Sequence, residues 1–113
     1  MSSPITTHVL DTSLGQPARG LEIVLSRQEG AGWSQIGRGV TNADGRIVDL
    51  MKPGSLKAGI YQMMFHTGAY LAQRESGGFY PRVPVIFEIT ATDQHYHVPL
   101  LLNPFGYSTY RGS

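Results

Sequence analysis

The residues best suited to chemistry in this chain are its histidines. The sequence holds four histidines and no cysteine, which excludes thiolate metal sites, disulfides and cysteine nucleophiles. His95 and His97 lie two residues apart in an apolar segment, and a strand would place both imidazoles on one face. His8 stands near the start of the chain among threonines, and His66 has no such companion. Because imidazole titrates near neutral pH, it suits general acid–base catalysis or metal binding.

Two other segments carry groups that complement a histidine site. Arg46 follows the Asp44-Gly45 pair, a strong turn signal, so it stands at a strand start where a guanidinium reaches over a sheet edge. Its planar set of donors matches a flat, carbonyl-rich molecule. The last four residues offer a phenol, a second guanidinium, a hydroxyl and a terminal carboxylate, and they are Tyr110, Arg111, Gly112 and Ser113.

Each of these residues also has a purely structural interpretation. Taken singly, His8 and His66 fit satisfied structural or surface histidines, and Arg46 fits a solvated charge or an ion-pair partner. The spacing of His95 and His97 allows a two-histidine metal site, but no local carboxylate or third ligand accompanies them. We therefore expect neither a metal nor a cofactor. Composition and spacing alone predict a β-sandwich with a histidine-lined interface.

The elements that must position these residues are short strands. Fourteen glycines and seven prolines punctuate short apolar runs along the whole chain, a pattern typical of an all-β sandwich or barrel. Period-two alternation predicts eight strands, at residues 5–10, 21–26, 33–40, 46–50, 59–67, 83–90, 95–102 and 107–111. Residues 16–20 read as a turn. One short helix is expected at residues 69–75, ended by Gly77-Gly78. We expect two four-stranded antiparallel sheets packed face to face.

The segment 95–102 predicts two buried surfaces. Its even positions form an apolar face that should point into the sandwich, and they are Tyr96, Val98, Leu100 and Leu102. The opposite face continues from the two histidines to Pro99 and Leu101. That face is too apolar for plain exposure to water, which indicates a subunit interface.

Length and charge narrow the class of protein further. At 113 residues the chain is one domain, spanning 1–113. The net charge is +1 with scattered basic residues, so no stripe for nucleic acid or an anionic membrane is predicted. No apolar run approaches the roughly 20 residues of a membrane span. The first residues also lack the basic and apolar regions of a signal peptide. These features predict a soluble protein in the cytoplasm.

Four strings together carry a family likeness. Residues 6–12 (TTHVLDT), 41–46 (TNADGR), 95–101 (HYHVPLL) and 107–113 (YSTYRGS) resemble the 5-hydroxyisourate hydrolases of the transthyretin-related family. The likeness runs from about residue 5 to the last residue, and the terminal Tyr-Arg-Gly-Ser is its most specific part. Transthyretin itself, a hormone carrier on the same fold, lacks that ending and this set of histidines.

The resemblance implies a transthyretin-like sandwich that pairs into dimers and then into a homotetramer, with active sites in a channel between dimers. It implies cofactor-free hydrolytic opening of the six-membered ring of 5-hydroxyisourate, a small molecule on the route from urate to allantoin. Position by position, it implies catalytic roles for His8, Arg46, His97 and Ser113. It implies substrate binding by His8, Arg46, Tyr110, Arg111 and Gly112.

The chain departs from the family pattern at one position, and two other functions remain as alternatives. Where the family often has an acidic residue after an aromatic-proline pair, this chain has Arg82 after Tyr80-Pro81, a change at the surface or at the channel mouth. The alternative function is a transthyretin-type carrier that binds an aromatic ligand in the channel between dimers. A plain structural or metal-storing sandwich is a third interpretation.

Overall fold

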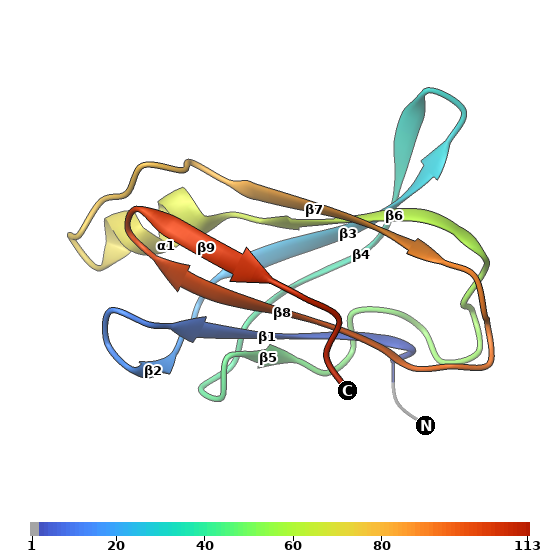
Figure 1. Cartoon of the computed structure of the whole chain (residues 1–113), viewed down its shortest axis with the longest axis horizontal. Coiled ribbons are helices and arrows are strands. Elements are labelled where there is room, and N and C mark those ends of the chain that lie inside the picture. Colours follow the sequence, from blue (N-terminus) through green and yellow to red (C-terminus); the bar gives the residue numbers. More distant parts are fainter. Residues whose placement is uncertain (1–2) are drawn as a thin grey trace.

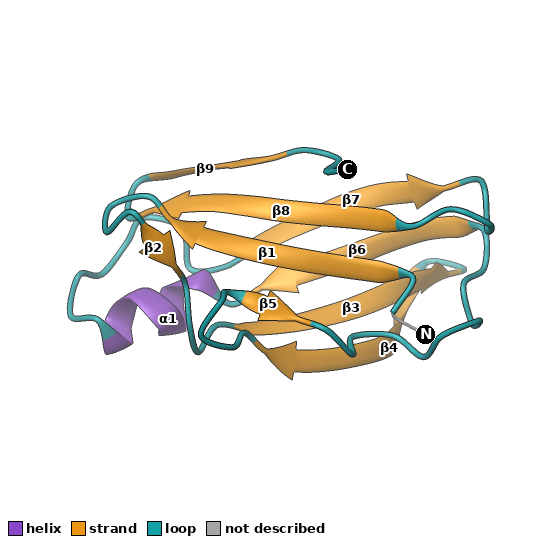
Figure 2. Ribbon diagram, turned by 90° about the horizontal axis from the view of Figure 1, so that it is seen from below, coloured by secondary structure: helices purple, strands orange, loops and turns teal. Residues whose placement is uncertain are grey.

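The computed structural model describes residues 3–113. Two β-sheets pack face to face, and one short helix lies at one end of the sandwich (Figure 1 and Figure 2). The strands are β1 (Ile5–Asp11), β2 (Gln16–Pro17), β3 (Glu22–Glu29), β4 (Gly32–Val40), β5 (Arg46–Ile47), β6 (Gly59–Phe65), β7 (Val83–Ile89), β8 (Tyr96–Asn103) and β9 (Gly106–Thr109). The helix is α1 (Thr67–Gln73). Within residues 3–113, no helix is long and apolar enough to cross a membrane.

The predicted all-β sandwich with one short helix is confirmed, and the details of the first sheet differ. One sheet has the strand order β2-β1-β8-β9 with β5 also paired to β1, and the other has the order β4-β3-β6-β7. The first sheet therefore has five strands, because residues 16–17, expected as a turn, pair with β1. In addition, β1 and β8 are parallel rather than antiparallel. Parallel neighbours need a long crossover, and here the whole second sheet lies between them in the chain.

Period-two alternation builds the core as the sequence predicts. In β6 the side chains of Tyr61, Met63 and Phe65 are all fully buried. In β8 the even positions 96, 98, 100 and 102 are buried, so the predicted inward face is confirmed. The folded chain exposes 6347 Å², close to the roughly 6,100 Å² that scaling by mass gives for a globular protein. The sandwich therefore has a core of ordinary size for its mass.

The predicted elements all exist, but their bounds differ in the structure by one to three residues at one or both ends. The strand expected at 46–50 ends at Ile47. The consecutive residues Leu50 and Met51 are both buried, whereas a strand turns consecutive side chains to opposite faces, so this segment does not continue as a strand. The helix starts at Thr67 and ends at Gln73, and the left-handed residue that follows it is Glu75, with φ 61°, ahead of the two glycines. The last strand stops at Thr109.

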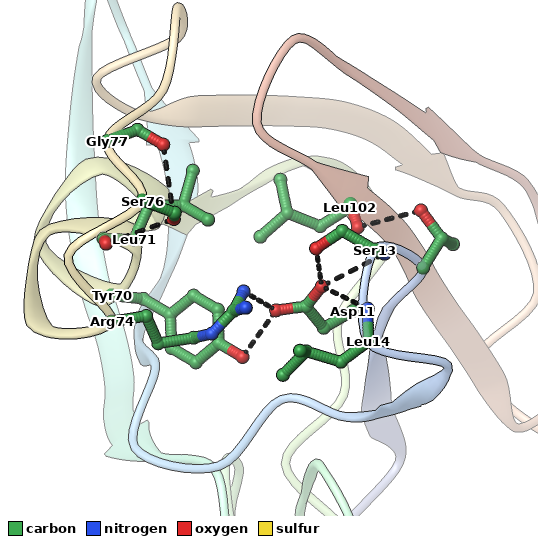
Figure 3. A network of polar contacts seen from close by, with 10 residues as sticks. Asp11, Ser13, Leu14, Tyr70, Leu71, Arg74, Ser76, Gly77 and Leu102 are labelled. Atoms are coloured by element: carbon green, nitrogen blue, oxygen red, sulfur yellow. Dashed lines mark hydrogen bonds and ion pairs between the residues drawn. The ribbon is translucent and has the colours of Figure 1, made fainter.

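A buried carboxylate ties the end of β1 to the helix (Figure 3). The Asp11 side chain is fully buried. Its Oδ2 accepts a hydrogen bond from the Tyr70 hydroxyl at 2.7 Å and forms an ion pair with Arg74. Its Oδ1 accepts from the hydroxyl and the amide of Ser13. This network holds α1 against the turn that follows β1.

The same network shifts two pKa values. Burial by itself raises the pKa of Asp11, but the hydrogen bonds from Ser13 and Tyr70 and the charge of Arg74 outweigh it, so the pKa is lowered. Burial and the neighbouring Asp11 carboxylate raise the pKa of Tyr70 to about 12. Because the folded-state pKa of Asp11 lies below its unfolded value, this stabilisation is complete above the unfolded pKa. It is lost as the pH falls through the folded one.

We expect Asp11→Asn to lower the free energy of unfolding by about 3 kcal/mol, because it leaves the Arg74 guanidinium without its partner. Chemical denaturation at fixed protein concentration measures this change, and the deficit should shrink as the pH falls through the folded-state pKa of Asp11. Asp93→Asn, at an exposed position, is the matched control and should stay within about 0.5 kcal/mol of the wild type. Equal stability of the two variants at neutral pH would contradict the role of Asp11.

Candidate active site

The outer face of the first sheet carries the predicted site. In β1 the inward residues are buried, whereas Thr6 and His8 are half-buried on the opposite face. The parallel pairing of β1 with β8 sets Thr6 beside His97, and the pairing of β1 with β5 sets His8 beside Arg46. Directly paired residues share a face of the sheet. The structure therefore places His8, Arg46 and His97 on the same outer face of the first sheet.

The turn before Arg46 explains why that residue starts a strand. Asn42 accepts hydrogen bonds at its side-chain Oδ1 from the amides of Asp44 and Arg46. Gly45 adopts φ 73°, and a Cβ there would lie 2.4 Å from the carbonyl oxygen of Val9. Only glycine fits such a close approach in a left-handed conformation. The predicted turn at Asp44-Gly45 is confirmed, and it delivers Arg46 opposite His8.

A threonine that the sequence analysis did not single out lies between His97 of β8 and His95, the residue that precedes β8. The Oγ1 atom of Thr6 lies 2.8 Å from Nδ1 of His97 and 3.0 Å from Nε2 of His95. The two imidazole rings lie nearly parallel, with centroids 6.5 Å apart. The sequence indicated only that Thr6 shares a strand face with His8, two residues away. It did not predict the parallel register that sets Thr6 beside His97.

The C-terminal residues return to the site over His97. The Gly112 amide donates a hydrogen bond to the His97 carbonyl at 2.8 Å, in an isolated antiparallel bridge. A Cβ at Gly112 would lie 2.6 Å from Cδ2 of the His97 ring. The main chain of the tail therefore lies against the imidazole, which requires glycine at this position.

A proline explains why β9 stops and the chain then comes back. The pairs from Leu100–Thr109 to Asn103–Gly106 have the same register as the His97–Gly112 bridge. Hydrogen-bonded pairs alternate along an antiparallel ladder, so the next such pair after 97–112 is 99–110. Pro99 has no N–H to donate to Tyr110. The Pro99 carbonyl instead accepts from the Thr109 hydroxyl at 2.8 Å, and the ladder is interrupted at Tyr110 and Arg111.

The other predicted residues of the tail lie beside the histidines rather than among them. Tyr110 and Arg111 line, with His97, a cavity of about 500 Å³ between β7 and β8. The Arg111 guanidinium lies 4.4 Å from the centre of the Tyr96 ring and donates to Gln94. Ser113 is exposed at the end of the chain.

Two further residues named in the sequence analysis lie outside this group. His66 directly precedes α1, and its amide donates a hydrogen bond to the Glu22 carbonyl of the second sheet. Arg82 is exposed in the segment that leads to β7. Neither residue shares the outer face of β1 and β8.

The electrostatics of the site favour neutral imidazoles. Burial lowers the pKa of His8, and the Arg46 charge lowers it further, against the opposing effect of the Asp44 main chain and carboxylate. Burial also lowers the pKa of His97, with added repulsion from Arg46, His8 and His95. An imidazole with a pKa below the ordinary value of about 6.5 is unprotonated at neutral pH and can accept a proton. The arrangement thus offers two bases beside a fixed cation.

The residues of the site do not form a metal-binding cluster. Across residues 3–113, no three histidine, cysteine, aspartate or glutamate side chains lie together in a way that could hold a metal ion. His95 and His97 face one shared hydroxyl instead. A hydroxyl placed between two imidazoles can exchange hydrogen bonds with both rings.

The structure is a β-sandwich that carries two histidines and an arginine together on one outer face. The sequence model of the HIUase/Transthyretin family matches residues 5–112. The chain is 49% identical to mouse 5-hydroxyisourate hydrolase over 114 residues, covering 99% of this chain and 97% of that protein. This chain belongs to the HIUase/Transthyretin family.

Solved structures of both branches of the family resemble the fold. Klebsiella pneumoniae 5-hydroxyisourate hydrolase matches with a TM-score of 0.86 and 39% identity, covering all of both chains. Sea bream transthyretin in complex with thyroxine matches with a TM-score of 0.92 and 34% identity, covering 96% of this chain and 94% of that one. The fold is therefore common to a 5-hydroxyisourate hydrolase and a transthyretin that binds thyroxine, so fold alone does not decide between hydrolysis and binding.

We expect Arg46→Gln to raise the pKa of both His8 and His97, because it removes a positive charge that disfavours imidazolium. Titration of the histidine ring protons by NMR measures both values without any substrate. Arg82→Gln removes an arginine from outside the site and should leave both titrations unchanged. Unchanged histidine titrations in Arg46→Gln would refute the electrostatic coupling.

We expect Gly112→Ala to displace either the His97 ring or the tail, since its Cβ would overlap the ring carbon. The ring resonances of His97 should shift, and the proposed turnover should fall by about tenfold or more, because misplacing a catalytic group by about 1 Å costs up to about 100-fold. Gly106→Ala is the control, because its nearest neighbour would lie at an ordinary 3.8 Å. Resonances and turnover as in the wild type would show that the close contact is not required.

Proposed function

We propose that this chain hydrolyses 5-hydroxyisourate, opening its six-membered ring to give 2-oxo-4-hydroxy-4-carboxy-5-ureidoimidazoline. The observation that carries the proposal is the meeting of His8, Arg46 and His97 on one outer face. The names of the relatives described above support it, as does the tail that packs on His97 through Gly112.

The chemistry needs a water molecule activated at an amide-like carbonyl. One imidazole, of His8 or His97, accepts a proton from water as the oxygen bonds to the carbonyl carbon. Negative charge then builds on the carbonyl oxygen, and the Arg46 guanidinium stabilises it. When the ring carbon–nitrogen bond breaks, an imidazolium returns the proton to the departing nitrogen. The proton taken from water thus reaches the departing nitrogen by way of a histidine, and the proposed reaction uses no cofactor.

The tail completes the proposed site. Tyr110 and Arg111 line the cavity beside His97, and we assign them to substrate binding with His8, Arg46 and Gly112. Ser113 follows Gly112 directly, so its hydroxyl is close enough in the chain to orient a water or an imidazole. We assign Ser113 a catalytic role on this basis.

We propose that the protein works as a homotetramer, a dimer of dimers. The outer face of β8 supports this assembly, because the apolar side chain of Leu101 stays partly exposed on the same face as His97 in the single chain. A second dimer across this face would enclose the site in a channel and exclude bulk water. The cytoplasmic location stays a prediction from the sequence.

A carrier function is the second candidate, and the close match to a transthyretin bound to thyroxine favours it. A carrier for a mostly apolar aromatic ligand needs a mostly apolar pocket with few polar groups. The outer face here presents two imidazoles and a guanidinium at its centre. The polarity of the site therefore favours the hydrolase.

We expect the protein to accelerate the decay of 5-hydroxyisourate in proportion to protein concentration. Urate oxidase generates the substrate in place, and its ultraviolet absorbance reports the decay against the uncatalysed rate. His8→Ala, His97→Ala and removal of residues 110–113 should each lower turnover by about 10²–10⁴-fold, because each removes proton transfer or the site wall. Size-exclusion chromatography checks that each variant stays assembled.

His66→Ala, which lies outside the site, should keep wild-type turnover. No acceleration by a well-folded tetramer would reject the hydrolase and favour ligand binding in the channel. Wild-type turnover in all three site variants would reject the assignment of residues.

A further inference from the structure

Two histidines of the site share one hydroxyl group. The Thr6 Oγ1 atom is within hydrogen-bond distance of Nδ1 of His97 and Nε2 of His95, at 2.8 and 3.0 Å. A hydroxyl has one proton to donate and two lone pairs. At most one of the two imidazole nitrogens can accept that proton, so at least one must approach Thr6 as an N–H donor. The protonation of the two rings is therefore coupled through Thr6.

We infer that Thr6 is a positioning residue that sets which nitrogen of His97 carries the proton, and that it links His97 to His95 as a path for one proton. The effect on turnover rests on the proposed hydrolase function, whereas the coupling of the two rings rests on the hydrogen-bond geometry alone.

The shared hydroxyl allows Thr6, His95 and His97 two arrangements of their protons. In the first, Nδ1–H of His97 donates to Thr6 and the Thr6 hydroxyl donates to Nε2 of His95. Nε2 of His97 then carries a lone pair and acts as a base. In the second, Nε2–H of His95 donates to Thr6 and the hydroxyl donates to Nδ1 of His97. Nε2 of His97 then carries the proton, and it can give that proton up as an acid only while Nδ1 takes one back from Thr6.

The protons that move between these states pass only among the side chains of His97, Thr6 and His95. After Nε2 of His97 takes a proton from water, the Nδ1 proton moves to Thr6 Oγ1 as the Thr6 proton moves to Nε2 of His95. His97 becomes a neutral acid and His95 an imidazolium. When Nε2 of His97 gives its proton to the departing nitrogen, the same path runs back. Only N–H and O–H bonds change.

The surroundings of His97 favour moving positive charge toward His95. The charged and titratable groups that act on His97 are His8 from β1, Arg46 from β5 and His95, which directly precedes β8. Arg46 pairs with His8, and His8 in turn pairs with Pro99 of β8. His95 is four residues before Pro99 in the chain and His97 is two, and His95 is exposed to water. The tail adds Arg111, which lies over Tyr96.

The test uses the whole protein labelled with ¹⁵N-histidine, because the protonated and lone-pair nitrogens of imidazole have well-separated ¹⁵N resonances. Thr6→Val removes the hydroxyl and keeps the side-chain shape, and Thr6→Ser restores the hydroxyl. Thr7→Val is the matched control, since Thr7 is the next residue of β1, points into the core and donates to the Val98 carbonyl.

We expect Thr6→Val to change the tautomer of His97 and to lower its pKa further, because imidazolium loses the oxygen that accepts from Nδ1–H. Thr6→Ser and Thr7→Val should give the wild-type tautomer and pKa. Turnover should follow the same pattern, with kcat lowered by about tenfold in Thr6→Val, KM little changed, and kcat rescued in Thr6→Ser. That loss lies below the about 10²–10⁴-fold that general acid–base catalysis supplies in full.

The wild-type tautomer and pKa of His97 in Thr6→Val would overturn the inference, as would a Thr6→Ser protein that behaves like Thr6→Val. A changed tautomer with unchanged kcat would overturn the proton path. Failure of the proposed function is a separate result, because it appears as wild-type protein that does not accelerate substrate decay. The NMR comparison decides the role of Thr6 in either case.

Discussion

The parallel pairing of β1 with β8 is the constraint on which the site depends. Side chains alternate across a strand, so one register sets the buried residues of both strands against the second sheet and turns Thr6, His8 and His97 outward together. A slip of one residue would bury the histidines and expose the core positions. The hydrophobic effect that fixes the core therefore also fixes the geometry of the site, without a separate source of energy.

A proline without an N–H and a glycine without a Cβ together bring the last residues of the chain to this face. Pro99 cannot donate in the ladder with β9, and the chain leaves β8 opposite it. Gly112 returns to the same register with its main chain against the His97 ring. Tails usually fray unless they are tied down, and this one is tied by a hydrogen bond to the residue that we place at the centre of the chemistry. The interruption also leaves Tyr110 and Arg111 free of the ladder and beside the cavity.

The fold alone does not separate the two kinds of relative that this chain resembles. A transthyretin and a hydrolase both superpose closely on this chain. Here the outer face combines two half-buried imidazoles with a guanidinium, and burial first and the Arg46 charge second lower the pKa of both rings. The buried Asp11 network lies at the other end of β1, where it fastens the helix. Stability and chemistry thus use different residues of the same strand.

The sequence by itself determined the all-β class, the inward faces of the strands and the turn that delivers Arg46, because alternation and turn residues are local properties of the chain. It also singled out His8, Arg46 and His97 through their likeness to a known family. It did not predict the pairing of Gln16–Pro17, the early end of β5 or the parallel register of β1 and β8. These depend on contacts between residues far apart in the chain. Only the tertiary structure placed Thr6 between His95 and His97, since 89 and 91 residues separate the partners of those hydrogen bonds.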